Sequence, residues 1–222
     1  QESLAAPALY QILRLNVELG NLTNATAALQ EIFAADRDLR FGDRSLLLLG
    51  QKLITAGQPA DARAILAGFN QKFGEQSPLR PQLELALARS YIQEKNWLGA
   101  LDQYQHWLAK FPTNELRPSA EFNYAWLHYQ AGRDSNAFTL FTNFLARHPT
   151  NELAPRAQFW LGDFYYRQND MLAAEKAYQH LFQNPNWAAK PLAFQARMMA
   201  VRATFARQAY GQAAYYITNL IV

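Results

Sequence analysis

The side chains that most often carry catalysis or bind metals are few and widely spaced in this sequence. Its four histidines, His106, His128, His148 and His180, form no i, i+4 pair of the kind that binds zinc on a helix. There is no cysteine, which excludes thiolate ligands, disulfides and a cysteine nucleophile. The sequence also has no G-x-S-x-G nucleophile motif, no phosphate-binding loop and no dinucleotide-binding glycine motif. We therefore predict that the protein is not an enzyme and has no catalytic residue, metal site or cofactor.

Basic side chains could bind nucleic acid if they shared one surface. The net charge is +3, from 21 basic and 18 acidic residues, and no acidic residue follows Glu175. The basic residues that do follow it are Lys176, Lys190, Arg197, Arg202 and Arg207. The three arginines are five residues apart, so on a helix each step turns by roughly 140° and the side chains point in three directions. We predict a solvated helix surface and no nucleic-acid partner.

An internal repeat organises the elements that position these side chains. Pro112-Thr-Asn-Glu-Leu-Arg-Pro118 recurs, with one change, as Pro149-Thr-Asn-Glu-Leu-Ala-Pro155, at an offset of 37 residues. A weaker copy precedes it at residues 77–81, and Pro185 and Pro191 keep the same separation of six residues one step later. Self-similarity at a fixed period is the signature of a repeat architecture.

A second marker has the same period. Alanines recur at intervals of 37, 38, 37, 37 and 39 residues, at Ala25, Ala62, Ala100, Ala137, Ala174 and Ala213. Large apolar residues follow four positions later, at Leu29, Leu66, Tyr104, Phe141, Tyr178 and Ile217, and seven positions later, at Ile32, Phe69, Trp107, Phe144, Leu181 and Leu220. Because positions i, i+4 and i+7 form one helix face, each set predicts a helix that buries this face.

Another helix is predicted before each of these, centred about twelve residues ahead of the alanine. Its middle pairs a large residue with a small one in most repeats, as at Leu49-Gly50. Glycine or asparagine between the two helices, such as Gly132 and Asn169, predicts a left-handed helix end, and prolines fall near helix starts. No strand pattern appears, and the longest apolar run, Ala213–Ile217, is too short to cross a membrane. We predict an all-α array of helix hairpins.

This combination resembles the tetratricopeptide repeat. The fifth repeat carries the likeness best, with Trp160-Leu-Gly-Asp-Phe-Tyr165, Asn169-Asp170, Ala174, Tyr178 and Pro185 in the family's order. The usual period is about 34 residues, and the longer one here is similar to that of bacterial cell-envelope members of the BamD type and the TolA-binding-protein type. The resemblance covers about residues 7–222 and implies a right-handed superhelical solenoid forming a single array over 1–222. Its six repeats would span about 7–40, 43–76, 79–113, 116–150, 153–187 and 189–222.

The resemblance also implies which side chains would meet a partner. In this family the first helix of each repeat lines the concave groove, where a protein or peptide partner would lie. Among the positions that match this pattern, the side chains nominated for partner binding are Phe122, Trp126, Tyr129, Phe159, Asp163, Tyr166, Arg167, Arg89 and Arg202. Aromatic residues and arginine are enriched at protein interfaces because they bury much area. For Trp126 and Phe159 the alternative is packing against the adjacent helix.

Three functions remain open at this point. The first is a non-catalytic scaffold that holds a peptide or protein segment in the groove, placed by resemblance in the bacterial periplasm or at the outer membrane. The second is a structural spacer that self-associates end to end through the apolar segment Ala213–Val222. The third is a helical accessory domain of a cell-wall or polysaccharide-processing system, whose sugars would stack on the same aromatic rings. The apolar C-terminal segment also leads us to expect a fragment of a longer repeat protein.

Overall fold

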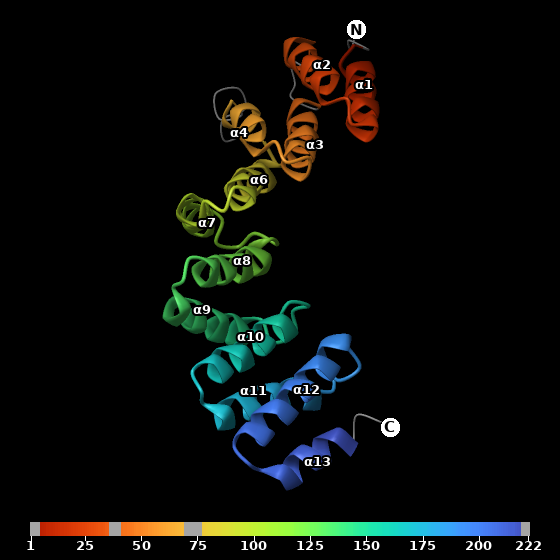
Figure 1. The fold of residues 1–222 in the computed structure, drawn as a ribbon. Coiled ribbons are helices and arrows are strands. Elements are labelled where there is room, and N and C mark those ends of the chain that lie inside the picture. Colours follow the sequence, from red (N-terminus) through yellow and green to blue (C-terminus); the bar gives the residue numbers. More distant parts are fainter. Residues whose placement is uncertain (1–4, 36–40, 69–76, 219–222) are drawn as a thin grey trace. The chain divides into compact units, whose positions relative to one another are not determined.

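The structure, a computed structural model, describes residues 5–35, 41–68 and 77–218. Within these ranges it contains twelve α-helices and no strand, which confirms the predicted all-α helical-repeat fold (Figure 1). The chain forms two compact units, Gln1–Arg117 and Pro118–Val222, and each is described by itself. That all six repeats form one array therefore stays a prediction.

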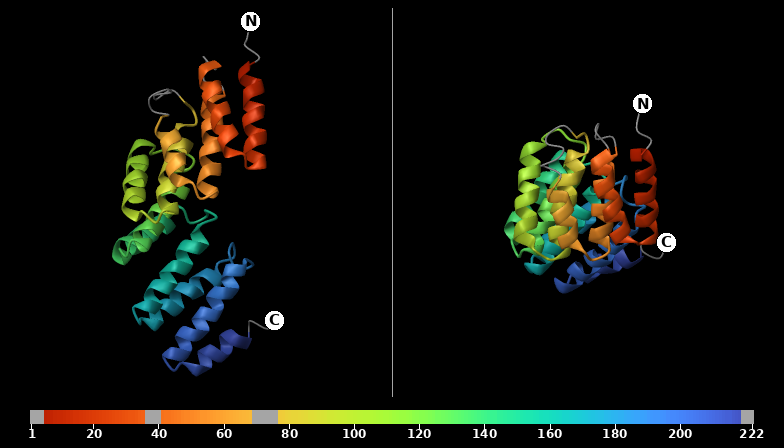
Figure 2. Two further views of the ribbon diagram at one scale, coloured as in Figure 1. Left: turned by 45° about the horizontal axis from the view of Figure 1, so that its top comes forward. Right: turned by 90° about the horizontal axis from the view of Figure 1, so that it is seen from above.

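The described helices form hairpins, which are consecutive helices joined by a short turn. In the first unit the pairs are α1 (Ala5–Leu19) with α2 (Leu22–Ala35), α3 (Gly42–Thr55) with α4 (Pro59–Ala67), and α6 (Arg80–Gln93) with α7 (Trp97–Lys110). The second set is α8 (Arg117–Gln130) with α9 (Asp134–Arg147), α10 (Ala154–Arg167) with α11 (Met171–Gln183), and α12 (Pro191–Ala206) with α13 (Tyr210–Thr218). Within each unit, neighbouring helices in the chain pack side by side (Figure 2).

Each hairpin turn contains one residue with a left-handed backbone, as predicted for the breaks between helices. Three of these residues are glycines, which adopt this conformation without strain: Gly20 (φ 78°), Gly57 (φ 79°) and Gly132 (φ 72°). The other three are Lys95 (φ 57°), Asn169 (φ 61°) and Gln208 (φ 62°). The same backbone geometry therefore closes all six turns, even where the sequence lacks glycine.

The repeated Pro-Thr-Asn-Glu-Leu element forms the link from one hairpin to the next. The side-chain oxygen of Asn114 accepts a hydrogen bond from the backbone N–H of Leu116 at 2.9 Å, and Asn151 does the same with Leu153 at 2.9 Å. In the weaker copy the hydroxyl of Ser77 accepts from the N–H two residues on, at 3.1 Å. A side chain that bonds the backbone two residues later competes with helix formation. It therefore keeps the linker in a turn just before the next helix begins. A proline near the first turn of the next helix follows, as predicted.

The alanine register is buried as predicted, since all six alanines are at most 4% exposed. The residues four positions later are also buried in the first five hairpins, where none is more than 3% exposed. The prediction is wrong at Ile217, which is 45% exposed. Ile217 lies near the end of α13, and no later described helix packs on that face. Two members of the pattern, Phe69 and Leu220, lie outside the described residues.

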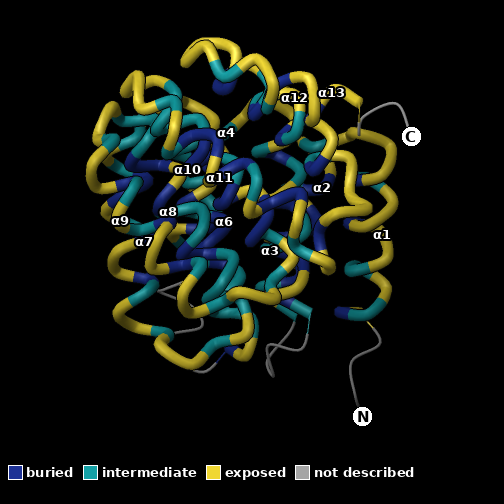
Figure 3. Tube along the Cα trace, turned by 90° about the horizontal axis from the view of Figure 1, so that it is seen from below, coloured by how far each residue is buried: buried dark blue, intermediate teal, exposed yellow. Residues whose placement is uncertain are grey.

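Buried and exposed residues alternate along each helix, so every described helix buries one side (Figure 3). The cluster in the first unit is mainly aliphatic, with Leu13, Leu29, Ile32, Leu46, Leu49, Leu53, Leu66 and Leu83 among its members. The cluster in the second unit contains the aromatic side chains Phe141, Phe144, Trp160, Tyr178, Phe182, Trp187 and Tyr216. One repeat pattern thus supports two different kinds of core.

Candidate functional site

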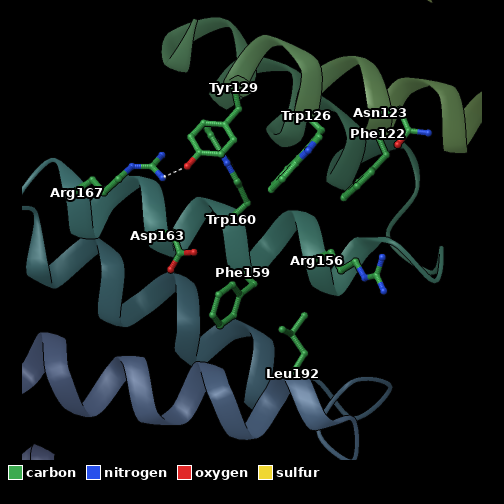
Figure 4. Close-up of a pocket in the computed structure, with 10 residues that line it drawn as sticks. All are labelled: Phe122, Asn123, Trp126, Tyr129, Arg156, Phe159, Trp160, Asp163, Arg167 and Leu192. Atoms are coloured by element: carbon green, nitrogen blue, oxygen red, sulfur yellow. Dashed lines mark hydrogen bonds between the residues drawn. The ribbon is translucent and has the colours of Figure 1, made fainter. Parts of the chain in front are cut away.

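A pocket of about 490 Å³ opens on the second unit, between α8, α10 and the start of α12 (Figure 4). The residues that line it are Phe122, Asn123, Trp126, Tyr129, Arg156, Phe159, Trp160, Asp163, Arg167 and Leu192. Most of the wall is aromatic or aliphatic, and two arginines lie at opposite ends of it. An apolar surface with a few polar groups at its margin is the usual composition of a ligand site.

The pocket gathers most of the side chains that the sequence nominated. Six of them line it: Phe122, Trp126, Tyr129, Phe159, Asp163 and Arg167. Tyr166 is half-buried against the core of the unit and does not line the pocket. Arg202 is exposed on α12 outside the pocket, and Arg89 lies on α6 in the first unit. That any of these residues binds a partner stays a prediction.

The aromatic wall is held partly by the core beneath it. The ring of Phe122 contacts Phe141 and Phe144 edge to face, with ring centroids 5.3 and 5.7 Å apart. Phe159 packs on the buried ring of Tyr178 at 5.5 Å, so the packing alternative holds for this residue in addition to its place in the pocket. Trp126 differs, because 41% of it is exposed. It is therefore the aromatic side chain of the pocket most available to a ligand.

Arg167 is already engaged at its end of the pocket. Its guanidinium donates to the hydroxyl of Tyr129 at 3.1 Å and lies over the Tyr129 ring, 4.8 Å from the centroid. The same group pairs with Asp134 of α9 at 3.4 Å. These contacts fix Arg167 against the wall, so it orients Tyr129 and has little freedom to bind a ligand anion.

Asp163 is the acidic residue of the lining set, and it too has partners. Its carboxylate accepts a hydrogen bond of 2.5 Å from the Tyr178 hydroxyl. Burial raises the pKa of Asp163, while the Tyr178 hydrogen bond and the charge of Arg167 oppose that increase. Burial, and then the bond to Asp163, raises the pKa of Tyr178. The pair is thus a half-buried structural contact between α10 and α11.

Four lining residues were missed by sequence reasoning: Asn123, Arg156, Trp160 and Leu192. Trp160 was assigned to packing, and it does pack, being 4% exposed and 4.7 Å from the Phe141 ring. Arg156 is exposed, and within the described residues it makes no hydrogen bond or ion pair. Its signal would have been a charge in the first turn of α10, where the preceding repeat has Ser119.

Titratable side chains outside the pocket are the other candidates for metal binding among the described residues. The described residues hold no group of three or more His, Asp or Glu side chains placed around a common metal position. His148 instead pairs with the buried carboxylate of Glu121 at 2.9 Å, beside Arg147 at 2.8 Å. None of the described helices is both long enough and apolar enough to span a bilayer.

Comparison with known proteins agrees with this architecture. Residues 119–151, which cover most of α8 and all of α9, match the family model described as tetratricopeptide repeat. No curated protein matches the sequence. Similar solved structures include a tetratricopeptide repeat protein from Parabacteroides merdae, with a TM-score of 0.66 and 14% identity over 98% of this chain and 79% of that one.

Two further structures are similar over nearly the whole chain. PilF of Pseudomonas aeruginosa has a TM-score of 0.65 and 14% identity, covering 97% of this chain and 90% of its own. The apo form of RapI has a TM-score of 0.70 and 10% identity, covering 97% of this chain and 64% of its own. At these identities the likeness shows the fold alone.

The hairpin repeats, the match over residues 119–151 and these neighbours together show a helical-repeat fold of the tetratricopeptide-repeat type. Proteins of this fold are generally non-catalytic, and their stacked hairpins present extended surfaces that bind other proteins. The closer likeness to the BamD-type and TolA-binding-protein-type members stays a prediction.

Proposed function

We propose that this protein is a non-catalytic interaction module that binds a peptide segment of another protein in the pocket of α8, α10 and α12. The observation that carries this proposal is Trp126, a tryptophan 41% exposed at the rim of a pocket whose other rings are half-buried or buried. Exposed tryptophan is costly to leave in water, and such residues are frequent centres of binding energy.

The pocket, at about 490 Å³, has room for apolar side chains of a peptide. A Leu or Phe side chain that leaves water for an apolar site contributes about 1.5–3 kcal/mol. The contacts of Phe122 and Phe159 with the core hold the walls in place, so binding orders few protein side chains. A pocket with aromatic walls held by the core supports moderate affinity for one or two anchor residues of an extended segment.

Panning a phage-displayed dodecapeptide library on the immobilised protein tests this proposal. We expect enriched peptides with a shared apolar position, and we expect Trp126→Ala to lose at least tenfold in affinity for them. Leu172→Ala is the matched control, because Leu172 is a 49% exposed apolar residue on α11 outside the pocket. Equal recovery of the same peptides by the Trp126 variant would contradict the proposal. Preferential binding of a chitin oligosaccharide would favour the polysaccharide-system alternative instead.

The second candidate, self-association, is favoured by the exposed face of the last hairpin. Phe194, Met198 and Phe205 lie on one side of α12 and are 57, 41 and 63% exposed, and Ile217 on α13 is exposed as well. End-to-end stacking would cover this face, although residues 219–222 of the predicted stacking segment lie outside the described residues. Sedimentation velocity of the wild type and Phe194→Glu at several concentrations tests it. A concentration-independent monomer in both would exclude self-association.

We also propose a location in the bacterial cell envelope, in the periplasm or at the outer membrane. The support is the repeat period of 37–39 residues and its Pro-Thr-Asn-Glu-Leu linker, which resemble the long-repeat members of those compartments. Fractionation of the source cells with an antiserum to this chain tests the location. Recovery with cytoplasmic markers would contradict it.

A further inference from the structure

We propose that the pocket selects an acidic, apolar peptide segment, in which an apolar side chain enters beside Trp126 and Phe159 and a carboxylate two residues away pairs with Arg156. This inference rests on the proposed function and specifies the chemistry of the partner. It follows from which charges in the pocket are already paired and which one is free.

Three charged side chains line the pocket, and two of them are committed to neighbours in the second unit. Arg167 is held by the hydroxyl of Tyr129 and the carboxylate of Asp134. Asp163 receives the hydrogen bond of Tyr178, which is itself fully buried. Neither group can turn to a ligand without giving up these contacts, so neither selects the charge of the ligand.

Arg156 is the third charge, and within the described residues it has no hydrogen-bond or ion-pair partner. The nearest acid in the sequence is Glu152, four residues earlier in the turn before α10, and no ion pair within 4 Å joins the two side chains. The Arg156 side chain is exposed at the end of the pocket opposite Arg167 (Figure 4). An exposed guanidinium without a partner binds a carboxylate well, because two of its parallel N–H groups match the two carboxylate oxygens.

The spacing along α10 sets the spacing expected in the ligand. Arg156 and Phe159 are three residues apart on the helix, which places their Cβ atoms about 5–6 Å apart on one face. In an extended peptide, side chains two residues apart lie on the same side at a separation of about 6.5 Å. A peptide with its apolar and acidic residues two positions apart therefore presents both groups to the two sites.

The charge of the unit favours the same ligand at longer range. Residues 118–222 contain nine Lys or Arg and six Asp or Glu, and after Glu175 the chain has only basic charges. This net positive charge attracts an acidic segment and repels a basic one, more strongly at low salt. A neutral apolar peptide would gain the pocket contacts without this attraction.

The test uses fluorescein-labelled Gly/Ser nonapeptides with Leu or Phe at the centre and Asp, Asn or Lys two residues to either side. Fluorescence anisotropy with the whole chain should show the Asp peptides binding about tenfold tighter than the Asn peptides, and the Lys peptides binding most weakly. Arg156→Glu should reverse this order, so that the Lys peptides bind tighter than the Asp peptides. Lys176→Glu is the matched control, because Lys176 is exposed on α11 outside the pocket and the change in charge is the same.

The outcomes separate this inference from the proposed function. Equal binding of the Asp and Asn peptides, or an unchanged order in Arg156→Glu, overturns the acidic selectivity. Loss of binding in Trp126→Ala would still support the pocket as the binding site in that case. If binding of every peptide is insensitive to Trp126→Ala, or no peptide binds, both proposals fail. Circular dichroism checks that Arg156→Glu folds, as expected for an exposed side chain without partners.

Discussion

The two units fill the same positions of the repeat with different side chains. Four residues after the helix alanine, the first unit has Leu29, Leu66 and Tyr104, and the second has Phe141 and Tyr178 in its first two hairpins. All five are at most 3% exposed. The repeat therefore specifies burial at this position but not the size or shape of the buried group.

The larger rings of the second unit need space from the facing helix. A Cβ added at Gly162 would lie 2.6 Å from Cδ1 of Tyr178, whereas a Cβ at Gly50 would lie 3.1 Å from the flexible end of Leu66. A Cβ at Gly162 therefore requires the ring of Tyr178 to move, whereas the side chain of Leu66 can adjust to a Cβ at Gly50.

The second unit also has the more aromatic surface of the two. Trp126 on α8 corresponds to Arg89 on α6 one repeat earlier, at an offset of 37 residues. A depression of about 480 Å³ on α6 and α7 is lined mainly by polar side chains, and its Glu84 is paired with Arg80 at 2.8 Å and with Lys110 at 2.9 Å. An aromatic layer that reaches the surface is thus what distinguishes the candidate binding site from an ordinary ion-paired surface.

The largest difference in stability is expected between alanine substitutions at Gly162 and at Gly50. Gly162→Ala should destabilise the protein by about 2–3 kcal/mol, because the tyrosine ring must move in a close-packed core. Gly50→Ala should be within about 1 kcal/mol of the wild type, since Leu66 can adjust and alanine favours the helix. Urea unfolding followed by circular dichroism measures both, and equal losses would refute the difference between the cores.

A smaller difference in stability is expected between variants of two ion pairs that lie at corresponding places in the two units. Glu175 is 5% exposed and accepts from Arg207 and Tyr216, whereas Glu94 pairs with Arg63 at 2.8 Å on the surface. Glu175→Gln should cost about 2 kcal/mol, because it leaves a partly buried guanidinium without its carboxylate. Glu94→Gln should cost about 0.5 kcal/mol, as is usual for exposed pairs. Unfolding free energies of both variants, measured in low and high salt, check this difference. Equal losses for Glu175→Gln and Glu94→Gln would contradict it.

Binding should separate the two surfaces with little change in stability. Trp126→Ala should weaken peptide binding at least tenfold, or about 1.4 kcal/mol, while Arg89→Ala should leave it unchanged. Both side chains are exposed, so the melting temperatures should stay close to that of the wild type. Isothermal titration with a peptide selected on the wild type measures the change. An equal loss in both variants would mean that the binding site is not confined to the second unit.

The smallest effect concerns pH and distinguishes His128 from Tyr91, which occupies the same place one repeat earlier. Burial, with a further contribution from Arg133, lowers the pKa of His128 below its ordinary value of 6.5. The folded state therefore binds this proton less readily than the unfolded state. Its stability is complete above pH 6.5 and is lost as the pH falls through the lowered pKa. The loss should be smaller in His128→Phe, and unfolding curves between pH 7.5 and 5 check this. The same pH dependence in both proteins would contradict it.

Most of the local architecture could be predicted from the sequence because it depends on residues close together in the chain. The alanine spacing located the buried helix faces, and the breaks at Gly132 and Asn169 marked left-handed helix ends. The recurring Asn114 and Asn151 marked turns in which a side chain bonds the backbone two residues later. These patterns act over four to seven residues, which is the range over which helices and turns form.

Only the tertiary structure decided which of those side chains form a pocket and which are free to bind. Tyr166 and Arg202 share the helical register of Phe159 and Asp163, yet neither of them lines the pocket. Arg156 was missed because its lack of a partner depends on groups brought near by folding, and Ile217 is exposed because no described helix covers it. Periodicity places a side chain on a helix face, but its exposure and its partners depend on neighbouring helices, which are distant in the sequence.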